Sequence, residues 1–233
     1  MRLAAALVLT ALTALAHPAD FPVLDGEIRA TIVYQRDARD EAEQAWQDLA
    51  SYLQQATGKG FIAVSEDRYQ SVEGARAIFV GRVEALPRED ARELRRMDRD
   101  GYLVHVTADR AFLAGPTPWA TYWAVCQFLE DYAGVRWLIP GPLGEDVPQS
   151  ERIVVPQLRQ VHSPRIPSRL WSGAHYGGVW SLRRRIHARY RFHHNLLNVF
   201  DSKYYDEHPE WFPLHGDQRY RPGKEDHSWQ PCL

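Results

Sequence analysis

The chain has 233 residues, a length that suits one large domain or one domain with part of a second. With 45% hydrophobic and 25% charged residues, its composition is that of a globular protein and excludes a disordered one. The formal net charge is −2 at pH 7, so no strong positive field attracts nucleic acid or an acidic membrane surface.

The first sixteen residues, "MRLAAALVLTALTALA", have the pattern of a secretory signal peptide. Arg2 is a minimal charged start, an apolar run follows, and Ala14-Leu15-Ala16 fits the small-residue cleavage pattern. The apolar run is short for a membrane span. We therefore predict a signal peptide at 1–16, rather than a buried helix, and an exported protein, periplasmic or extracellular, with no membrane span after its removal.

Cys126 and Cys232 are the two cysteines of the chain. An oxidising compartment permits a disulfide bond, but two thiols so far apart in sequence do not imply one. Cys126 lies within an apolar helical pattern, which favours a small buried residue.

Strand and helix patterns alternate along the first third of the chain. Residues 27–34 alternate in polarity, as a half-buried strand does. Apolar residues then recur at helical spacing from Ala42 to Leu53, and Gly58 is placed to end that helix. Short apolar runs at 61–64 and 77–81 predict buried strands.

The following segment predicts a helix at 87–97, a hairpin and a second helix. Two alternating runs flank Ala108-Asp109, which indicates a hairpin with His105 in its first strand, as a ligand or base or as an ordinary strand residue. Thr117 and Pro118 are a helix cap and first turn, and Gly134 is a C-terminal cap. Further strands are predicted at 135–141 and 151–156.

This order of elements predicts the α/β fold class for a domain at 24–157. The segment 157–169 carries two prolines and is typical of a linker. From residue 168 the chain becomes rich in aromatic residues and glycine, which is more typical of strand-and-loop units around a site than of a closed core.

Several stretches resemble a known family. "IFVG", "DGYLVHV" and the run from Phe128 to Gly141 are similar to the N-terminal domain of α-glucuronidases of glycoside hydrolase family 67, a module that also precedes the barrel of β-hexosaminidases. The whole chain, from about residue 24, more closely resembles secreted bacterial proteins that join this domain to a domain of unknown function. Their "HN" pair and "HPEWF…G" segment correspond here to 194–195 and 208–216. One departure is Trp119-Ala120, where the family usually has Arg-Gly.

The resemblance implies a small α/β sandwich-type domain followed, at 168–233, by the start of a (β/α)8 barrel. A complete barrel needs about 250 residues, so we expect a fragment of a longer protein with little or no turnover of its own. Glycoside hydrolysis usually needs two carboxyl groups, and the family places them on later strands. The local acids are therefore not assigned as the catalytic pair, which stays unknown. They are Asp201, Asp206, Glu207 and Glu210.

Binding roles are predicted for residues of the second part. The Arg169 guanidinium can hold a sugar carboxylate with two parallel hydrogen bonds, and the face of the Trp171 indole can pack against a pyranose ring. The alternative is that Arg169 forms a salt bridge within the protein and Trp171 belongs to its core. His194 and Asn195 match the family pair and can bond hydroxyl groups. His208, Glu210 and Trp211 are predicted to form a lid or rim of the sugar site. The alternative is that they only hold a loop in place.

Eight of the ten histidines follow position 160, but no His-Glu-x-x-His motif or paired-cysteine spacing accompanies them, so no metal and no cofactor are expected. The basic run 183–191 is interpreted as a solvated helix face and not as a polyanion patch. The hypothesis is an exported, glycoside-hydrolase-like protein that binds glycans with uronic acid or amino sugars. A non-catalytic glycan-binding module and a cell-envelope interaction domain are the alternatives.

Overall fold

The computed structural model describes residues 20–170, 178–189, 203–219 and 221. The chain forms two compact units, residues 1–165 with 173–185 and residues 166–172 with 186–233. The predicted signal peptide lies outside the described residues and stays a prediction.

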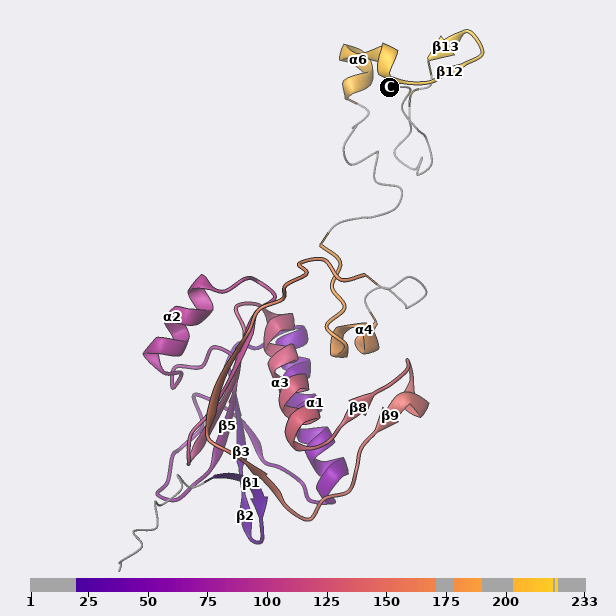
Figure 1. The fold of residues 1–233 in the computed structure, drawn as a ribbon. Helices are drawn as coiled ribbons and strands as arrows, with labels where there is room; N and C mark the ends of the chain where they lie inside the picture. Colours follow the sequence, from indigo (N-terminus) through magenta and orange to yellow (C-terminus); the bar gives the residue numbers. More distant parts are fainter. Residues whose placement is uncertain (1–19, 171–177, 190–202, 220, 222–233) are drawn as a thin grey trace, which may run out of the picture. The chain divides into compact units, whose positions relative to one another are not determined.

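The first unit is built on a six-stranded mixed sheet (Figure 1). Four neighbouring strands of this sheet are parallel, and β6 and its neighbours β7 and β11 pair antiparallel. In sheet order the strands are β11 (Leu158–His162), β6 (Tyr102–Val106), β7 (Arg110–Ala114), β5 (Ala77–Val80), β3 (Thr31–Tyr34) and β4 (Ala63–Ser65). The α/β fold class predicted from the sequence is confirmed for this unit.

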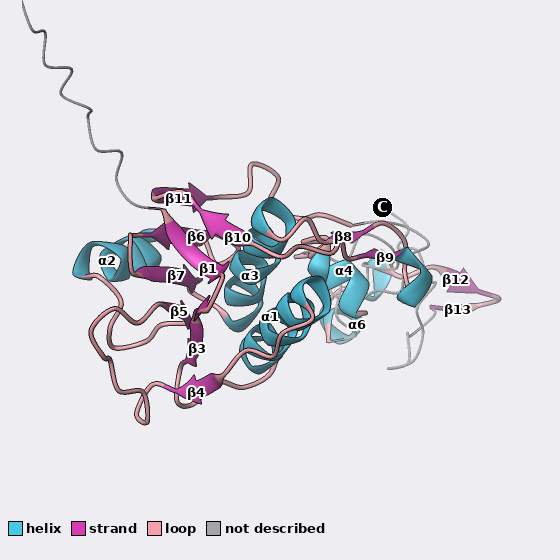
Figure 2. Ribbon diagram, turned by 90° about the horizontal axis from the view of Figure 1, so that it is seen from below, coloured by secondary structure: helices cyan, strands magenta, loops and turns pink. Residues whose placement is uncertain are grey.

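Helices cover both faces of the sheet. Helices α1 (Glu41–Thr57) and α3 (Pro118–Tyr132) pack side by side on one face, whereas α2 (Arg88–Arg96) lies on the other and contacts β6. Figure 2 shows the strands between α2 and the α1–α3 pair. Strand side chains alternate accordingly: Ile78 belongs to the larger core with α1 and α3, and Phe79 to the smaller core with α2.

Local sequence signals set the ends of the two long helices. Thr117 Oγ1 accepts a hydrogen bond from the Ala120 N–H (3.3 Å), and Pro118 occupies the first turn of α3. Gly58 and Gly134 follow α1 and α3 with φ of 69° and 72°, the left-handed region that favours glycine. The predicted caps are confirmed, and the Trp119-Ala120 departure leaves the start of α3 intact.

The predicted strand at 27–34 is two strands in the structure. They are β2 (Ile28–Arg29) and β3, which belong to different sheets. Strand β2 pairs with β1 (Phe21–Asp25), and β1 also pairs with β10 (Ile153–Val155). The sequence did not indicate β1, because its first four residues are all buried and show no alternation.

The segment interpreted as a linker contains a strand. Strand β11 pairs with β6 over five residues and forms an edge of the main sheet. Its middle residues are exposed and its polar composition is typical of an edge strand, which explains why the pattern resembled a linker. The remaining pair of the unit is β8 (Arg136–Trp137) with β9 (Glu145–Asp146). A short helix, α4 (Val179–Arg183), completes it.

Residues 203–219 of the second unit form a small aromatic cluster. Helix α6 (Tyr204–Glu207), a 3₁₀ turn at Pro209–Trp211 and the hairpin of β12 (Leu214–His215) with β13 (Gln218–Arg219) surround the buried Phe212. Tyr205 packs edge-on to Phe212 at 5.3 Å. The start of a barrel stays a prediction.

Candidate functional site

Four of the seven residues predicted to contact a sugar lie within the described part of the chain: Arg169, His208, Glu210 and Trp211. The other three, Trp171, His194 and Asn195, lie outside the described residues. All seven belong to the second unit or to its entry segment at 166–172.

Arg169 forms hydrogen bonds with nearby backbone groups. Its Nη1 donates to the carbonyl oxygen of Ile166 (2.8 Å), and its backbone N–H donates to the carbonyl of His187 (2.8 Å). The Arg189 N–H donates to Ser168 Oγ at 3.0 Å, so the segments 166–169 and 187–189 are bonded together. One guanidinium donor of Arg169 thus supports its own turn.

His208, Glu210 and Trp211 are brought together in one turn. The imidazole of His208 stacks on the Trp211 indole with ring centres 4.0 Å apart and planes 7° apart. Its Nδ1 lies 3.1 Å from Glu210 Oε1, and the side chains of His208 and Glu210 are 41% and 60% exposed. The backbone N–H of Glu210 and then the side chain of His208 donate hydrogen bonds to the Glu210 carboxylate, and these bonds hold its pKa below the usual value. Both contacts favour the ionised carboxylate, which is a hydrogen-bond acceptor.

The interpretation of the run 183–191 as a solvated helix face is wrong for its first residue, because helix α4 ends at Arg183 and only 13% of the Arg183 side chain is exposed. Arg183 is instead the centre of a polar cluster of the first unit. The Arg183 guanidinium donates to Asp48 Oδ2 (3.0 Å), Glu145 Oε1 (2.6 Å) and the Tyr122 hydroxyl (3.1 Å). It also lies 5.2 Å from the centre of the Tyr52 ring. Arg183 thus ties α4 to α1, α3 and β9.

The phenols of this cluster complete its hydrogen bonding. The Tyr52 hydroxyl donates to Glu145 Oε2 (2.7 Å) and accepts from Trp137 Nε1 (3.0 Å), while the Tyr122 hydroxyl donates to Asp48. Burial is the main reason that the pKa of both phenols is raised, so both stay protonated.

Burial alone would lower the Arg183 pKa, but Tyr122, Asp48 and Tyr52 raise it above its usual value. The guanidinium therefore stays charged, and both carboxylates of the cluster have a cationic partner. This arrangement holds α4 in place.

A cavity of about 510 Å³ lies beside this cluster, lined in part by Glu145, Trp180 and Arg183. Trp180 Nε1 donates to the Trp137 carbonyl (3.1 Å), so α4 is also bonded to β8. The sequence signal for the cluster was Asp48, an acid on the buried stripe of an otherwise apolar helix face.

His105 has a polar partner within the fold. Its Nδ1 lies 2.6 Å from Asp90 Oδ2, and Arg159 Nε donates to the other oxygen of Asp90 at 2.8 Å. Asp90 is fully buried, so the three residues join α2, β6 and β11 from the inside. This geometry gives His105 a structural contact and supports the interpretation as an ordinary strand residue.

Within the described residues, no group of three or more His, Cys, Asp or Glu side chains could hold a metal ion. Cys126 is a buried free thiol of α3, and burial raises its pKa. None of the helices in the described ranges is long and apolar enough to cross a membrane.

Neither the protein-family models nor the curated protein sequences gave a match to this chain. Solved structures with some similarity include the GH20 β-N-acetylhexosaminidase of Streptomyces coelicolor A3(2), at 18% identity and a TM-score of 0.42. That alignment covers 65% of this chain and 25% of that one. A Streptomyces plicatus β-hexosaminidase in complex with the product GlcNAc is 16% identical, with a TM-score of 0.42 and the same coverage.

A third solved structure is the Flavobacterium johnsoniae chitobiase, at 14% identity and a TM-score of 0.36, aligned over 66% of this chain and 20% of that one. The chain thus spans a quarter or less of the length of these proteins. Similarity at these TM-scores does not establish a shared fold.

Proposed function

We propose that the chain is part of an exported, glycoside-hydrolase-like protein that acts on glycans with amino sugars or uronic acids. In this proposal the first unit is an α-glucuronidase N-terminal-like support, and the sugar-binding domain begins within residues 168–233, of which 173–185 belong to the first unit. The proposed sugar-contacting residues are Arg169, Trp171, His194, Asn195, His208, Glu210 and Trp211.

The observation that carries the proposal is the surface cluster of His208, Glu210 and Trp211. The indole, the imidazole and the ionised carboxylate of this turn combine an apolar ring with hydrogen-bonding groups. A sugar has the complementary features, an apolar ring face and hydroxyl groups that donate and accept hydrogen bonds. In the first unit, the buried or partly buried carboxylates Asp48, Asp90 and Glu145 are engaged with arginines in structural contacts.

The test is sugar binding by the full chain, measured by saturation-transfer difference NMR with N-acetylglucosamine and with glucuronic acid. Glu210→Gln removes the carboxylate charge and keeps its shape, and we expect at least about 5-fold weaker binding, about 1 kcal/mol. Trp211→Ala should weaken binding further, because the apolar ring is lost.

Glu207→Gln is the matched control, since Glu207 is an exposed acid of α6 three residues away. It should change the affinity less than about 2-fold. Equal effects of the two Glu→Gln variants, or no binding of either sugar, would reject the role of this cluster.

A further inference from the structure

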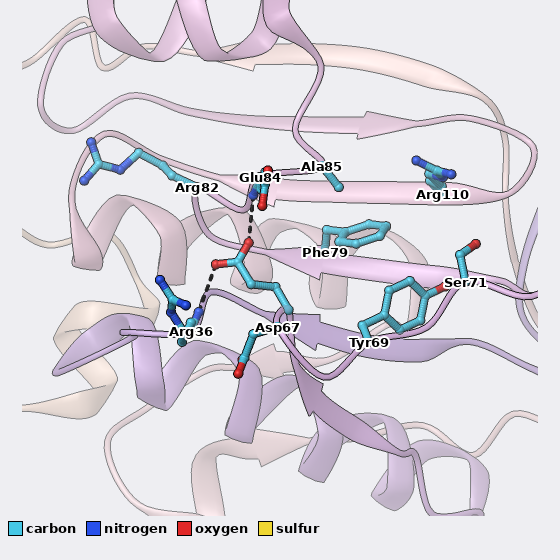
Figure 3. Close-up of a pocket in the computed structure, with 10 residues that line it drawn as sticks. Arg36, Asp67, Tyr69, Ser71, Phe79, Arg82, Glu84, Ala85 and Arg110 are labelled. Atoms are coloured by element: carbon cyan, nitrogen blue, oxygen red, sulfur yellow. Dashed lines mark hydrogen bonds between the residues drawn. The ribbon is translucent and has the colours of Figure 1, made fainter.

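The first unit has a second hollow, distant in sequence from the proposed sugar-contacting residues. It is a trough of about 600 Å³ lined by residues that follow three parallel strands (Figure 3). Arg36 follows β3, Glu66 and Asp67 follow β4, and Arg82 and Glu84 follow β5. The volume is within the usual range for sites that bind small molecules.

The topology of the sheet places this trough at its switch point. From β3 the chain passes through α1 to β4 on one side, and from β5 it passes through α2 toward β6 on the other. β3 and β5 are parallel neighbours, and the connections that follow them leave in opposite directions, which is the condition for a crevice at their carboxyl ends. Open α/β sheets generally bind ligands at this position.

The walls of the trough are held by Glu66. Its Oε1 accepts from the Arg36 N–H (3.0 Å) and its Oε2 accepts from the Glu84 N–H (2.7 Å), as the dashed lines of Figure 3 show. The loops after β3 and β5 are thereby fixed to the loop after β4. Gln35 Oε1 accepts from the Arg82 N–H at 3.1 Å and adds a second tie. Walls held in this way need little ordering when a ligand binds.

The floor of the trough is aromatic. The half-buried Tyr69 ring meets Phe79 edge-on at 5.7 Å, and Phe79 stacks on Phe112 at 5.1 Å. Tyr69 and Phe79 lie beside each other in Figure 3, below Ala85 and between the charged groups at either end. A ring fixed by packing offers an apolar surface without loss of side-chain entropy.

Four polar groups around this floor have no protein partner for their side chains among the described residues. They are the guanidinium of Arg82, the carboxylate of Glu84 and the hydroxyls of Tyr69 and Ser71. The charged lining consists of three arginines (Arg36, Arg82, Arg110) and three acids (Glu66, Asp67, Glu84), so it is neutral overall. Such a lining offers donors and acceptors together and does not favour an anion or a cation.

We infer that this trough binds a neutral oligosaccharide. Sugar hydroxyls donate and accept hydrogen bonds at once, which matches a rim of arginine, carboxylate and hydroxyl groups. The apolar face of a pyranose ring matches the Tyr69 ring. This second site goes beyond the proposed function, which places the sugar contacts in the second unit, and each can fail without the other.

The experiment is isothermal titration calorimetry of the full chain with the neutral trimers chitotriose, cellotriose and xylotriose, and with the anionic trimer of galacturonic acid. Arg82→Ala should weaken binding of a neutral trimer at least about 10-fold, and Tyr69→Phe, which keeps the ring, about 3-fold or more. The neutral lining predicts that affinity changes less than about 2-fold between low and high salt.

Arg92→Ala is the matched control, because Arg92 is an exposed arginine of α2 outside the trough. It should leave the affinity unchanged. The inference is overturned if no neutral trimer binds, if Arg82→Ala and Tyr69→Phe bind as the wild type does, or if only the acidic trimer binds and salt abolishes its binding. Neutral-trimer binding that Glu210→Gln removes and Arg82→Ala preserves would support the second-unit site and reject the trough.

Discussion

Arg183 shows how much of the first unit depends on one side chain. Its guanidinium contacts Asp48, Glu145 and Tyr122, and only 13% of its side chain is exposed. An ion pair at such a position is costly to break, because the remaining carboxylates would be left desolvated without a cation. Its neighbour Arg184 pairs with Glu130 at 3.4 Å but is 44% exposed, so water replaces that contact.

We therefore expect Arg183→Met to lower the free energy of unfolding by about 3 kcal/mol or more. Arg184→Met should lower it by less than about 1 kcal/mol. Urea unfolding followed by tryptophan fluorescence measures both. Similar losses for the two variants would show that the buried cluster adds little stability.

His162 is a second residue whose surroundings determine its chemistry. Its ring stacks on Tyr102 at 4.7 Å, and its buried Nε2 has no hydrogen-bond partner in the described part of the chain. Burial, and then the positive charge of Arg185, lower its pKa, while Asp131 acts in the opposite direction. The folded state therefore favours the neutral imidazole.

This shift predicts a pH dependence of stability. Below an unfolded pKa of about 6.5, the unfolded chain takes up a proton that the folded chain resists, so stability falls as the pH drops toward the folded pKa. His162→Phe keeps a stacked ring and removes the titration. The variant should lose less stability than the wild type between about pH 7.5 and about pH 5 in urea unfolding. Identical losses would contradict the assignment.

At the scale of elements, the junction of β7 and α3 is tight at Gly115. A Cβ placed on Gly115 would lie 2.5 Å from the carbonyl carbon of Ala120, which is backbone and cannot rotate away. The Gly115 N–H also donates to Thr121 Oγ1 at 3.2 Å inside the core. The start of α3 therefore depends on the absence of a side chain at this position.

Gly115→Ala should push the first turn of α3 away from β7 and lower the free energy of unfolding by about 1–3 kcal/mol. The control is Gly60→Ala, since a Cβ at Gly60 meets nothing within 4 Å and its backbone is not in the left-handed region. It should change stability by about 0.5 kcal/mol or less. Thermal unfolding followed by circular dichroism compares the two, and a stable Gly115→Ala variant would mean that α3 moves freely at its start.

Helices and hairpins were the elements best predicted from the sequence. The β6–β7 hairpin and helix α3 follow from alternation, a cap residue and a glycine, all of which act within a few residues. Strand β11 was missed because its partner β6 lies more than fifty residues away in sequence and its own composition is polar. Strand β1 was missed because its buried residues do not alternate, although its hairpin partner β2 is close in sequence.

At the scale of the whole molecule, the chain divides into two compact units with different roles in the proposal. The first supports the trough at the switch point of its sheet, and the second carries the His208–Glu210–Trp211 cluster. That cluster could be anticipated because its members are adjacent in sequence. The trough could not, because its walls come from loops near residues 36, 66 and 82, which the order of the strands brings to one edge.

The sequence by itself determined the fold class of the first unit, the ends of its long helices and the composition of the candidate sugar cluster, because these depend on short-range periodicity and capping. The tertiary structure alone decided the strand order, the site at the carboxyl ends of the parallel strands and the partners of Arg183. Asp48 and Arg183 are 135 residues apart, and an ion pair across that distance depends on the packing of α1, α3 and α4, which no local pattern encodes.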